Sequence, residues 1–215
     1  MAKKENSNFN LLVFDMDGTL IDSRKDIVSA VNYTIKQFGQ SELPSHEIEP
    51  YLGTGVQPLI EKLVGIANFK TGFDLFRDYY MSRCCQETEL YPGIPEVLDF
   101  YSDLPKVILT NKTNEFVEPI LEGLAIGQHF LEWYGRHSFE TRKPDPGPLL
   151  AISKKFNIEP SKVLMIGDTD VDITAGKRAG TQTCRVLYGY GKVSENSNLN
   201  ADYTVSDPLE LMSLG

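Results

Sequence analysis

The chain has 215 residues, of which 41% are hydrophobic and 24% are charged, and its formal net charge of -9 corresponds to an isoelectric point near 4.9. This length suits one sizeable domain or a core with a smaller insertion, and the composition excludes a disordered chain. A large nucleic-acid interface needs a basic face, so the acidic balance predicts no nucleic-acid partner.

The cysteines and the hydropathy pattern indicate the cellular compartment of the protein. Cys84, Cys85 and Cys184 include no C-x-x-C spacing, which favours reduced thiols over a disulfide framework or a zinc site. The first ten residues, "MAKKENSNFN", are polar, and no apolar run approaches the roughly 20 residues that span a membrane. We therefore expect a cytoplasmic protein without a membrane partner.

Strand-like and helix-like segments alternate along most of the chain. Continuous apolar or β-branched runs predict strands at Leu11–Asp15, Val107–Thr110, Val163–Gly167, Thr183–Leu187 and Tyr203–Val205. Helical patterns occur at Glu96–Tyr101, Asn114–Gly123, Asp145–Phe156 and Val171–Ala179. Runs of this kind are typical of parallel strands that are buried on both faces. The alternation predicts an α/β fold with a Rossmann-like, three-layer core around a parallel sheet.

The stretch between the first two strands is too long for a single crossover. Its apolar residues recur at helical spacing over three segments, Ile27–Phe38, Val56–Val64 and Phe73–Cys85. The sequence "YPGIPEV", rich in proline and glycine, follows them and marks the return to the core. We therefore predict a small helical cap domain at residues 22–90, inserted into a core of residues 1–21 and 91–215.

Polar side chains follow three of the predicted strands, at the point where each strand ends. They are Asp15 and Asp17 after the first strand, Thr110 and Asn111 after the second, and Asp168 and Asp172 after the third. A loop that reads "RKPDP" adds Lys143. Ligands of open α/β sheets bind outside the carboxyl ends of the strands, so we expect these groups to meet in one crevice.

Each group in this crevice would have a physical task. Clustered carboxylates repel one another unless a cation lies between them, and Mg²⁺ accepts one or two protein carboxylates together with a substrate phosphate. Lys143 offers a positive charge and Thr110 a hydroxyl to the phosphate. One carboxylate can then attack phosphorus while the other moves protons. A turn or a helix cap would explain any one of these groups alone, but not all of them in this order.

Four segments, "FDMDGTLIDS", "ILTNK", "RKPDP" and "MIGDTDVDI", resemble the four ordered motifs of the haloacid dehalogenase superfamily. The resemblance extends from Leu11 to about Val205, and the helical insertion matches the class with a helical cap. The segments "DMDGTLIDSRKDIVSAVNYTI", "LGTGVQPLIEKL" and "YPGIPEVL" are most similar to the phosphoglycolate phosphatase branch.

The resemblance implies a Mg²⁺-dependent hydrolase of a small phosphorylated metabolite. Asp15 would be the nucleophile and a metal ligand, and Asp17 would be the general acid and base with its backbone carbonyl on the metal. Asp168 would be the further carboxylate ligand of the metal, and Asp172 would support the site.

The phosphoryl group would be bound by Thr110, Asn111 and Lys143. The cap would close over the crevice and select the leaving group. Within "YLGTGVQ", Thr54 and Gly55 are the expected substrate contacts. The protein is expected to be a monomer or a homodimer.

Related activities stay open on the sequence alone. A dehalogenase lacks the second carboxylate, so Asp17 favours phosphoryl chemistry. A sugar phosphomutase of the β-phosphoglucomutase type carries a histidine shortly after the first motif, whereas this chain reads "DSRKDI" and has no histidine before His46. A pyrophosphatase or nucleotidase would use the same core residues. A non-catalytic protein that binds a phosphoryl ligand could also share the fold, but it would not need both Asp15 and Asp17.

Overall fold

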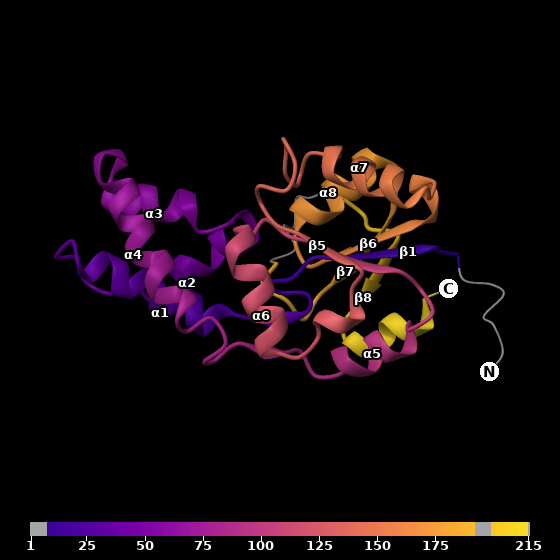
Figure 1. The fold of residues 1–215 in the computed structure, drawn as a ribbon, viewed down its shortest axis with the longest axis horizontal. Helices are drawn as coiled ribbons and strands as arrows, with labels where there is room; N and C mark the ends of the chain where they lie inside the picture. The colour runs from indigo at the N-terminus through magenta and orange to yellow at the C-terminus, as the bar shows by residue number, and fades with distance from the viewer. Residues whose placement is uncertain (1–7, 192–198, 215) are drawn as a thin grey trace.

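A computed structural model describes residues 8–191 and 199–214, and its centre is a six-stranded parallel sheet with the strand order β5-β4-β1-β6-β7-β8 (Figure 1). The strands are β1 (Leu11–Phe14), β4 (Lys106–Leu109), β5 (Glu132–Tyr134), β6 (Val163–Gly167), β7 (Gln182–Val186) and β8 (Tyr203–Val205). The predicted strands therefore lie within a residue of their observed positions. β1 lies between β4 and β6, so its carboxyl end opens at the middle of the sheet edge.

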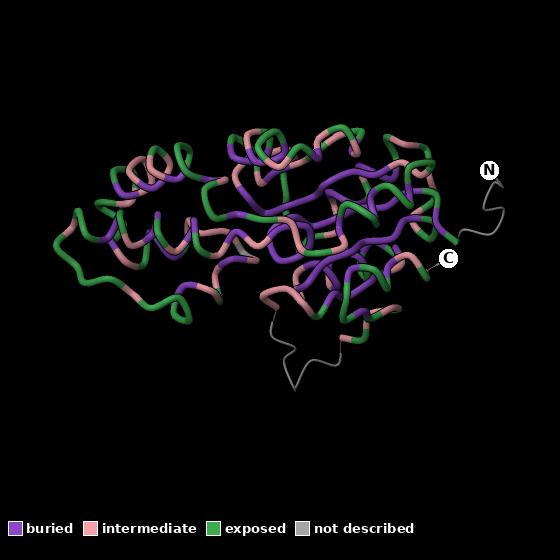
Figure 2. Tube along the Cα trace, turned by 90° about the horizontal axis from the view of Figure 1, so that it is seen from below, coloured by how far each residue is buried: buried purple, intermediate pink, exposed green. Residues whose placement is uncertain are grey.

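Both faces of the sheet are covered, and alternate residues of β1 face opposite layers. Leu12 and Phe14 belong to one core cluster, while Leu11 and Val13 belong to another. The first layer contains α5 (Ile94–Phe100) and α6 (Val117–Gly123), and the second contains α7 (Gly147–Phe156) and α8 (Asp170–Ala179). The central strands β1, β4 and β6 are buried along their whole length, and buried chain runs through the middle of the molecule in Figure 2. This arrangement confirms the predicted Rossmann-like, three-layer fold.

Between β1 and β4 the chain leaves the sheet through a short antiparallel ribbon. In this ribbon β2 (Ile21–Asp22) pairs with β3 (Glu89–Leu90). The helical segment that lies between them contains α1 (Arg24–Lys36), α2 (Ser45–Ile48), η1 (Glu49–Thr54), α3 (Gln57–Val64), η2 (Ile66–Asn68) and α4 (Phe69–Met81). Its helices gather to one side of the sheet, in indigo and purple in Figure 1.

The helical segment packs on itself and against the core. Its end is tied to its beginning by Asp26, whose carboxylate accepts hydrogen bonds from the backbone N–H groups of Glu87 and Thr88. Across the boundary the ring of Tyr80 on α4 meets Phe116 of the core edge to face, with 4.9 Å between centroids. Such aromatic contacts are worth roughly 0.5–1.5 kcal/mol beyond area burial. Aromatic packing therefore joins the segment to the core.

Several elements differ from the sequence-based expectation. α4 begins at Phe69, four residues before the predicted start, and the short helices between α1 and α3 were not predicted. Residues 129–140, where no strand was predicted, include β5 at the sheet edge. Three residues with one exposed side chain carry too little periodicity to predict a strand. Part of the chain between β7 and β8, residues 192–198, lies outside the described residues.

None of the helices within the described parts of the chain has the length and the apolar character that a membrane span requires.

Candidate active site

Asp15 begins the site, directly after β1. Its backbone N–H continues the sheet pairing with a 2.8 Å bond to the carbonyl of Ile166, which holds the residue at the carboxyl edge. Lys143 Nζ lies 2.7 Å from Asp15 Oδ1 and 2.6 Å from Asp172 Oδ1, and all three residues are buried. Burial raises the pKa of Asp15 well above its usual range, Asp172 and Asp168 add to this rise, and Lys143 opposes it. The lysine thus joins two carboxylates that would otherwise repel each other.

Asp172 is placed by the start of α8. Its Oδ2 accepts hydrogen bonds from the backbone N–H and the hydroxyl of Thr169, at 3.1 and 2.7 Å, which forms a capping box. The same side chain therefore caps a helix with one oxygen and binds Lys143 with the other.

Asp168 lies at the end of β6 in a tight backbone cradle. Its Oδ2 accepts hydrogen bonds from the N–H groups of Tyr190 and Gly191 at 2.8 and 3.0 Å. Gly18 has a φ of +89°, and a Cβ there would lie 2.2 Å from this same oxygen, so only glycine allows the approach. Burial, and next the charge of Asp172, raise the pKa of Asp168 to about 7.

The carboxylates of Asp15, Asp168 and Asp172 fit a divalent cation. One oxygen of each lies within 4.8 Å of the others, and all three are buried. The second oxygen of Asp168, Oδ1, is buried without a hydrogen-bond partner among the described residues. A buried carboxylate oxygen without a donor is costly, and a cation would satisfy it. The donor set is all oxygen, which suits Mg²⁺.

Asp17 lies apart from this carboxylate cluster. Lys112 Nζ donates to both of its carboxylate oxygens at 2.9 and 3.1 Å, and the Ser23 hydroxyl donates at 2.5 Å. The sequence-based ligand set included Asp17 through its backbone carbonyl, and that part stays a prediction.

Lys112 was not among the residues predicted for the site. It is the lysine of "ILTNK". Its position directly after Thr110 and Asn111, at the end of a strand, is the sequence feature from which its place in the site could have been predicted.

Thr110 and Asn111 lie where the sequence placed them, beyond β4. The Thr110 hydroxyl accepts from the backbone N–H of Lys112 at 3.1 Å, which turns the chain. The Asn111 side-chain amide donates to the carbonyl of Lys143 at 3.0 Å and to that of Gly53 at 3.4 Å. Asn111 thereby ties the lysine loop to the helical segment.

Of the two residues predicted as substrate contacts, Gly55 lies against the core. A Cβ on Gly55 would come within 3.2 Å of the carbonyl oxygen of Asn111. Thr54 is the last residue of η1, and its side chain is outside the described part of the structure.

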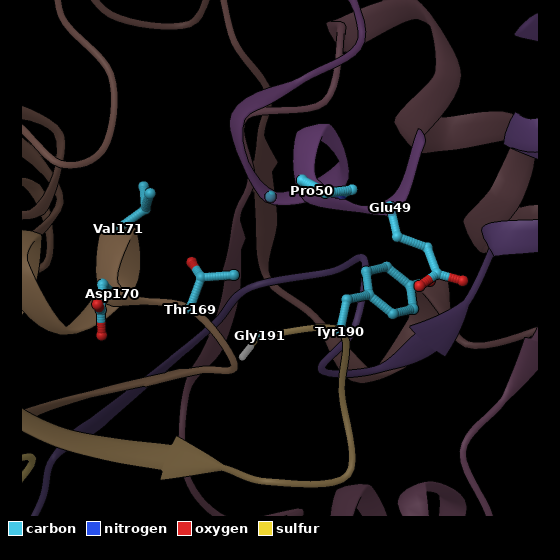
Figure 3. Close-up of a pocket in the computed structure, with 8 residues that line it drawn as sticks. Glu49, Pro50, Thr169, Asp170, Val171, Tyr190 and Gly191 are labelled. Carbon is cyan, nitrogen blue, oxygen red and sulfur yellow. The ribbon is translucent and has the colours of Figure 1, made fainter. Parts of the chain in front are cut away.

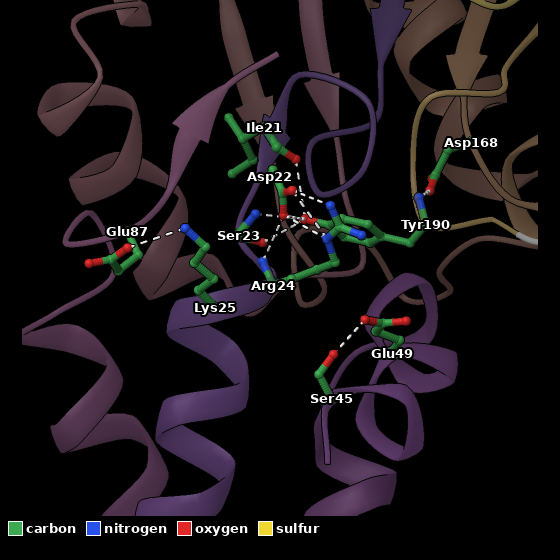
Figure 4. Close-up of polar contacts among 10 residues, drawn as sticks. All are labelled: Ile21, Asp22, Ser23, Arg24, Lys25, Ser45, Glu49, Glu87, Asp168 and Tyr190. Atoms are coloured by element: carbon green, nitrogen blue, oxygen red, sulfur yellow. Dashed lines mark hydrogen bonds and ion pairs between the residues drawn. The ribbon is translucent and has the colours of Figure 1, made fainter.

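Tyr190 is a second residue of the site that the sequence did not predict. Its backbone holds Asp168, while its hydroxyl accepts a 2.6 Å hydrogen bond from the backbone N–H of Ser23 (Figure 4). The guanidinium of Arg24 lies 5.3 Å from the centre of its ring. Tyr190 therefore connects the cluster carboxylate to the point where the chain enters the helical segment.

A cavity of about 280 Å³ lies beside Asp168, between η1 and the core. Its lining residues are Glu49, Pro50, Gly53, Thr169, Asp170, Val171, Tyr190 and Gly191 (Figure 3). The cavity is thus shared by the helical segment, the start of α8 and the loop that follows β7.

Several known proteins are similar to this chain in sequence and in fold. The family model for haloacid dehalogenase-like hydrolases matches residues 12–186. Phosphoglycolate phosphatase from Aquifex aeolicus is 37% identical over 206 residues, which cover 95% of each chain. Phosphoglycolate phosphatase from Haemophilus influenzae is 32% identical and covers 97% of this chain and 99% of its own.

Solved structures agree with these relatives. A crystal structure from Haemophilus somnus, described as that of a predicted phosphoglycolate phosphatase, aligns with a TM-score of 0.90 at 26% identity. The alignment covers 96% of this chain and 98% of that one. These similarities confirm the resemblance inferred from the four motifs, including its phosphoglycolate phosphatase-like branch. The chain belongs to the family of haloacid dehalogenase-like hydrolases.

Proposed function

We propose that the protein is a Mg²⁺-dependent phosphatase that hydrolyses a small phosphomonoester such as 2-phosphoglycolate through an aspartyl-phosphate. The observation that carries this proposal is the buried cluster in which Lys143 bridges Asp15 and Asp172. Beside it lies Asp168 Oδ1, which has no hydrogen-bond partner in the described parts of the chain. The names of the relatives support the same chemistry.

The carboxylates of Asp15 and Asp168, with Asp172 beside them and the Asp17 carbonyl as a further ligand, would hold Mg²⁺. The ion would neutralise charge on the phosphoryl oxygens. Lys143, Thr110 and Asn111 would bind the same group, the lysine as a point charge. Most of the catalysis would then be positioning and charge neutralisation.

In the first step a carboxylate oxygen of Asp15 attacks phosphorus, and the bond from phosphorus to the ester oxygen breaks. Asp17 gives its proton to the departing oxygen, which leaves as an alcohol. In the second step Asp17 takes a proton from water as the water oxygen attacks phosphorus. The bond between phosphorus and Asp15 breaks, and inorganic phosphate leaves.

We further propose that residues 22–90 act as a cap domain over a core of residues 1–21 and 91–215. The ribbon of β2 and β3 brings the two boundaries together, with Ile21 opposite Leu90. Closure of such a cap would exclude water from the first step. We place the enzyme in the cytoplasm because Cys84, Cys85 and Cys184 are free thiols, and we expect it to be a monomer or a homodimer.

Phosphate release from a panel of phosphomonoesters and from pyrophosphate, with Mg²⁺ and with EDTA, tests the proposal. The esters are 2-phosphoglycolate, sugar phosphates and nucleoside monophosphates, so kcat/KM separates the related activities. Asp15→Asn should abolish turnover with the fold intact, whereas Asp103→Asn, at an exposed position, should not change it. Mass spectrometry checks for deamidation of the new asparagine. Absence of phosphate release across the panel, or full activity of Asp15→Asn, would contradict the proposal.

A further inference from the structure

Lys112 is a buried lysine at the boundary between the core and the helical segment. Its side chain is 6% exposed, and its Nζ contacts both carboxylate oxygens of Asp17. The same ammonium lies 4.9 Å from the ring centre of Tyr80, on α4. Burial of an ammonium costs desolvation free energy, even between a carboxylate and an aromatic ring. The backbone turn at this position does not require the ammonium to be buried, because an exposed lysine would allow the same turn.

A small cavity adjoins this lysine on the side of the helical segment. Asp17, Lys112 and Thr113 line it from the core, and Leu52, Val56 and Tyr80 are among the residues that line it from the helical segment. Its volume of about 20 Å³ holds roughly one water molecule. Lys112 thus supplies a positive charge to the lining of a small, otherwise largely apolar cavity.

The position of Asp17 indicates which part of a substrate would lie in this cavity. In the proposed reaction Asp17 protonates the ester oxygen of the leaving group, so that oxygen must lie within hydrogen-bond reach of its carboxylate. In the proposed reaction the phosphoryl group would lie on the side of Asp15 and Lys143. The carbon substituent of the ester oxygen must therefore extend past Asp17, where Lys112 and the small cavity lie.

We propose that Lys112 is a specificity-determining residue that binds an anionic group on the leaving group, one carbon away from the ester oxygen, as in a phosphorylated 2-hydroxy acid. The inference rests on the proposed phosphatase function. On binding, the ammonium would exchange one of its two contacts with Asp17 for the carboxylate of the substrate. The other contact would keep Asp17 in place.

A second cation, Arg136, lies close to Gly55, one of the residues that line this cavity. The backbone N–H of Arg136 donates to the carbonyl of Lys112 at 2.8 Å. Its guanidinium lies 3.0 Å from the point that a Cβ on Gly55 would occupy, and Gly55 also lines the cavity. Two cations and a small volume favour a compact anionic leaving group over a neutral or bulky one.

The test compares two-carbon esters of similar size whose terminal group is anionic, neutral or cationic. These are 2-phosphoglycolate, the neutral 2-hydroxyethyl phosphate and the cationic phosphoethanolamine. For the wild-type protein we expect kcat/KM to favour 2-phosphoglycolate about 10- to 100-fold, the range for one charge-assisted hydrogen bond in a buried site. In Lys112→Met the preference should fall to within about threefold, mainly through KM for 2-phosphoglycolate. Lys112→Arg should retain part of it.

The contact with Asp17 means that Lys112→Met can also slow every ester, so the ratio between esters is the readout. Lys112→Gln keeps a donor to Asp17 without the charge, and it serves if the methionine variant does not fold. Equal losses on the anionic and neutral esters would overturn the inference and leave the phosphatase function standing. Equal kcat/KM for both esters in the wild-type protein would do the same. No turnover of any phosphate ester or of pyrophosphate would overturn both.

Discussion

Replacement of Lys143 by methionine tests whether the lysine neutralises the carboxylate cluster. The methionine has a similar length but no charge, so Asp15 and Asp172 lose contacts of 2.7 and 2.6 Å. At an effective dielectric constant of about 20, each contact contributes ~6 kcal/mol of gross attraction. The burial of the ammonium offsets most of this sum, and loss of one partner from a buried ion pair costs about 3–5 kcal/mol net.

We expect the free energy of unfolding in EDTA to fall by that amount, measured by urea denaturation at pH 7.5. This loss is a large part of the roughly 5–15 kcal/mol of a typical domain. The double variant Lys143→Met with Asp172→Asn should regain part of it, because one of the unpaired carboxylates is removed. Lys154→Met, at an exposed position of α7, is the matched control. A loss below ~1 kcal/mol, or no recovery in the double variant, would refute the electrostatic argument.

Three further predictions test other parts of the site and the fold. Asp17→Asn should lower kcat about 10²- to 10⁴-fold with the fold unchanged, and a kcat within threefold of wild type would remove Asp17 from proton transfer. Gly18→Ala should destabilise the protein by about 1–3 kcal/mol or more and raise the Mg²⁺ concentration for half-maximal activity, because φ is +89° and the new Cβ meets Asp168. The control Gly39→Ala has φ of +73° but open space, so it should affect stability alone. Burial favours a higher pKa for Asp202, but hydrogen bonds from Lys177 and Thr183 lower it overall. Its stabilising effect is therefore present above about pH 4 and lost as the pH falls through the lowered pKa. The urea midpoint of Asp202→Asn should lie below that of wild type at pH 7 and approach it at pH 3, and a constant difference would contradict the assignment.

Much of the fold could be predicted because it depends on local pattern. The run Val163–Gly167 is apolar throughout, and a strand of a parallel sheet that is buried on both faces has that composition. The order of Asp15, Thr110 and Asp168 after successive strands was equally informative, since parallel strands bring their carboxyl ends to one edge. β5 carried no such signal, because a short edge strand is half exposed and is defined by its neighbour, β4.

Strand patterning and the position of each motif after its strand were enough to predict which side chains reach the edge of the sheet. How those side chains pair there depends on the folded chain. Lys112 meets Asp17 across 95 positions, and Tyr190 meets Ser23 across 167. Such contacts depend on strand register and on the packing of the helical segment against the core, and neither leaves a periodic trace in the chain. The carboxylate of Asp17 is therefore held by a lysine of the second motif, apart from the cluster that Lys143 joins.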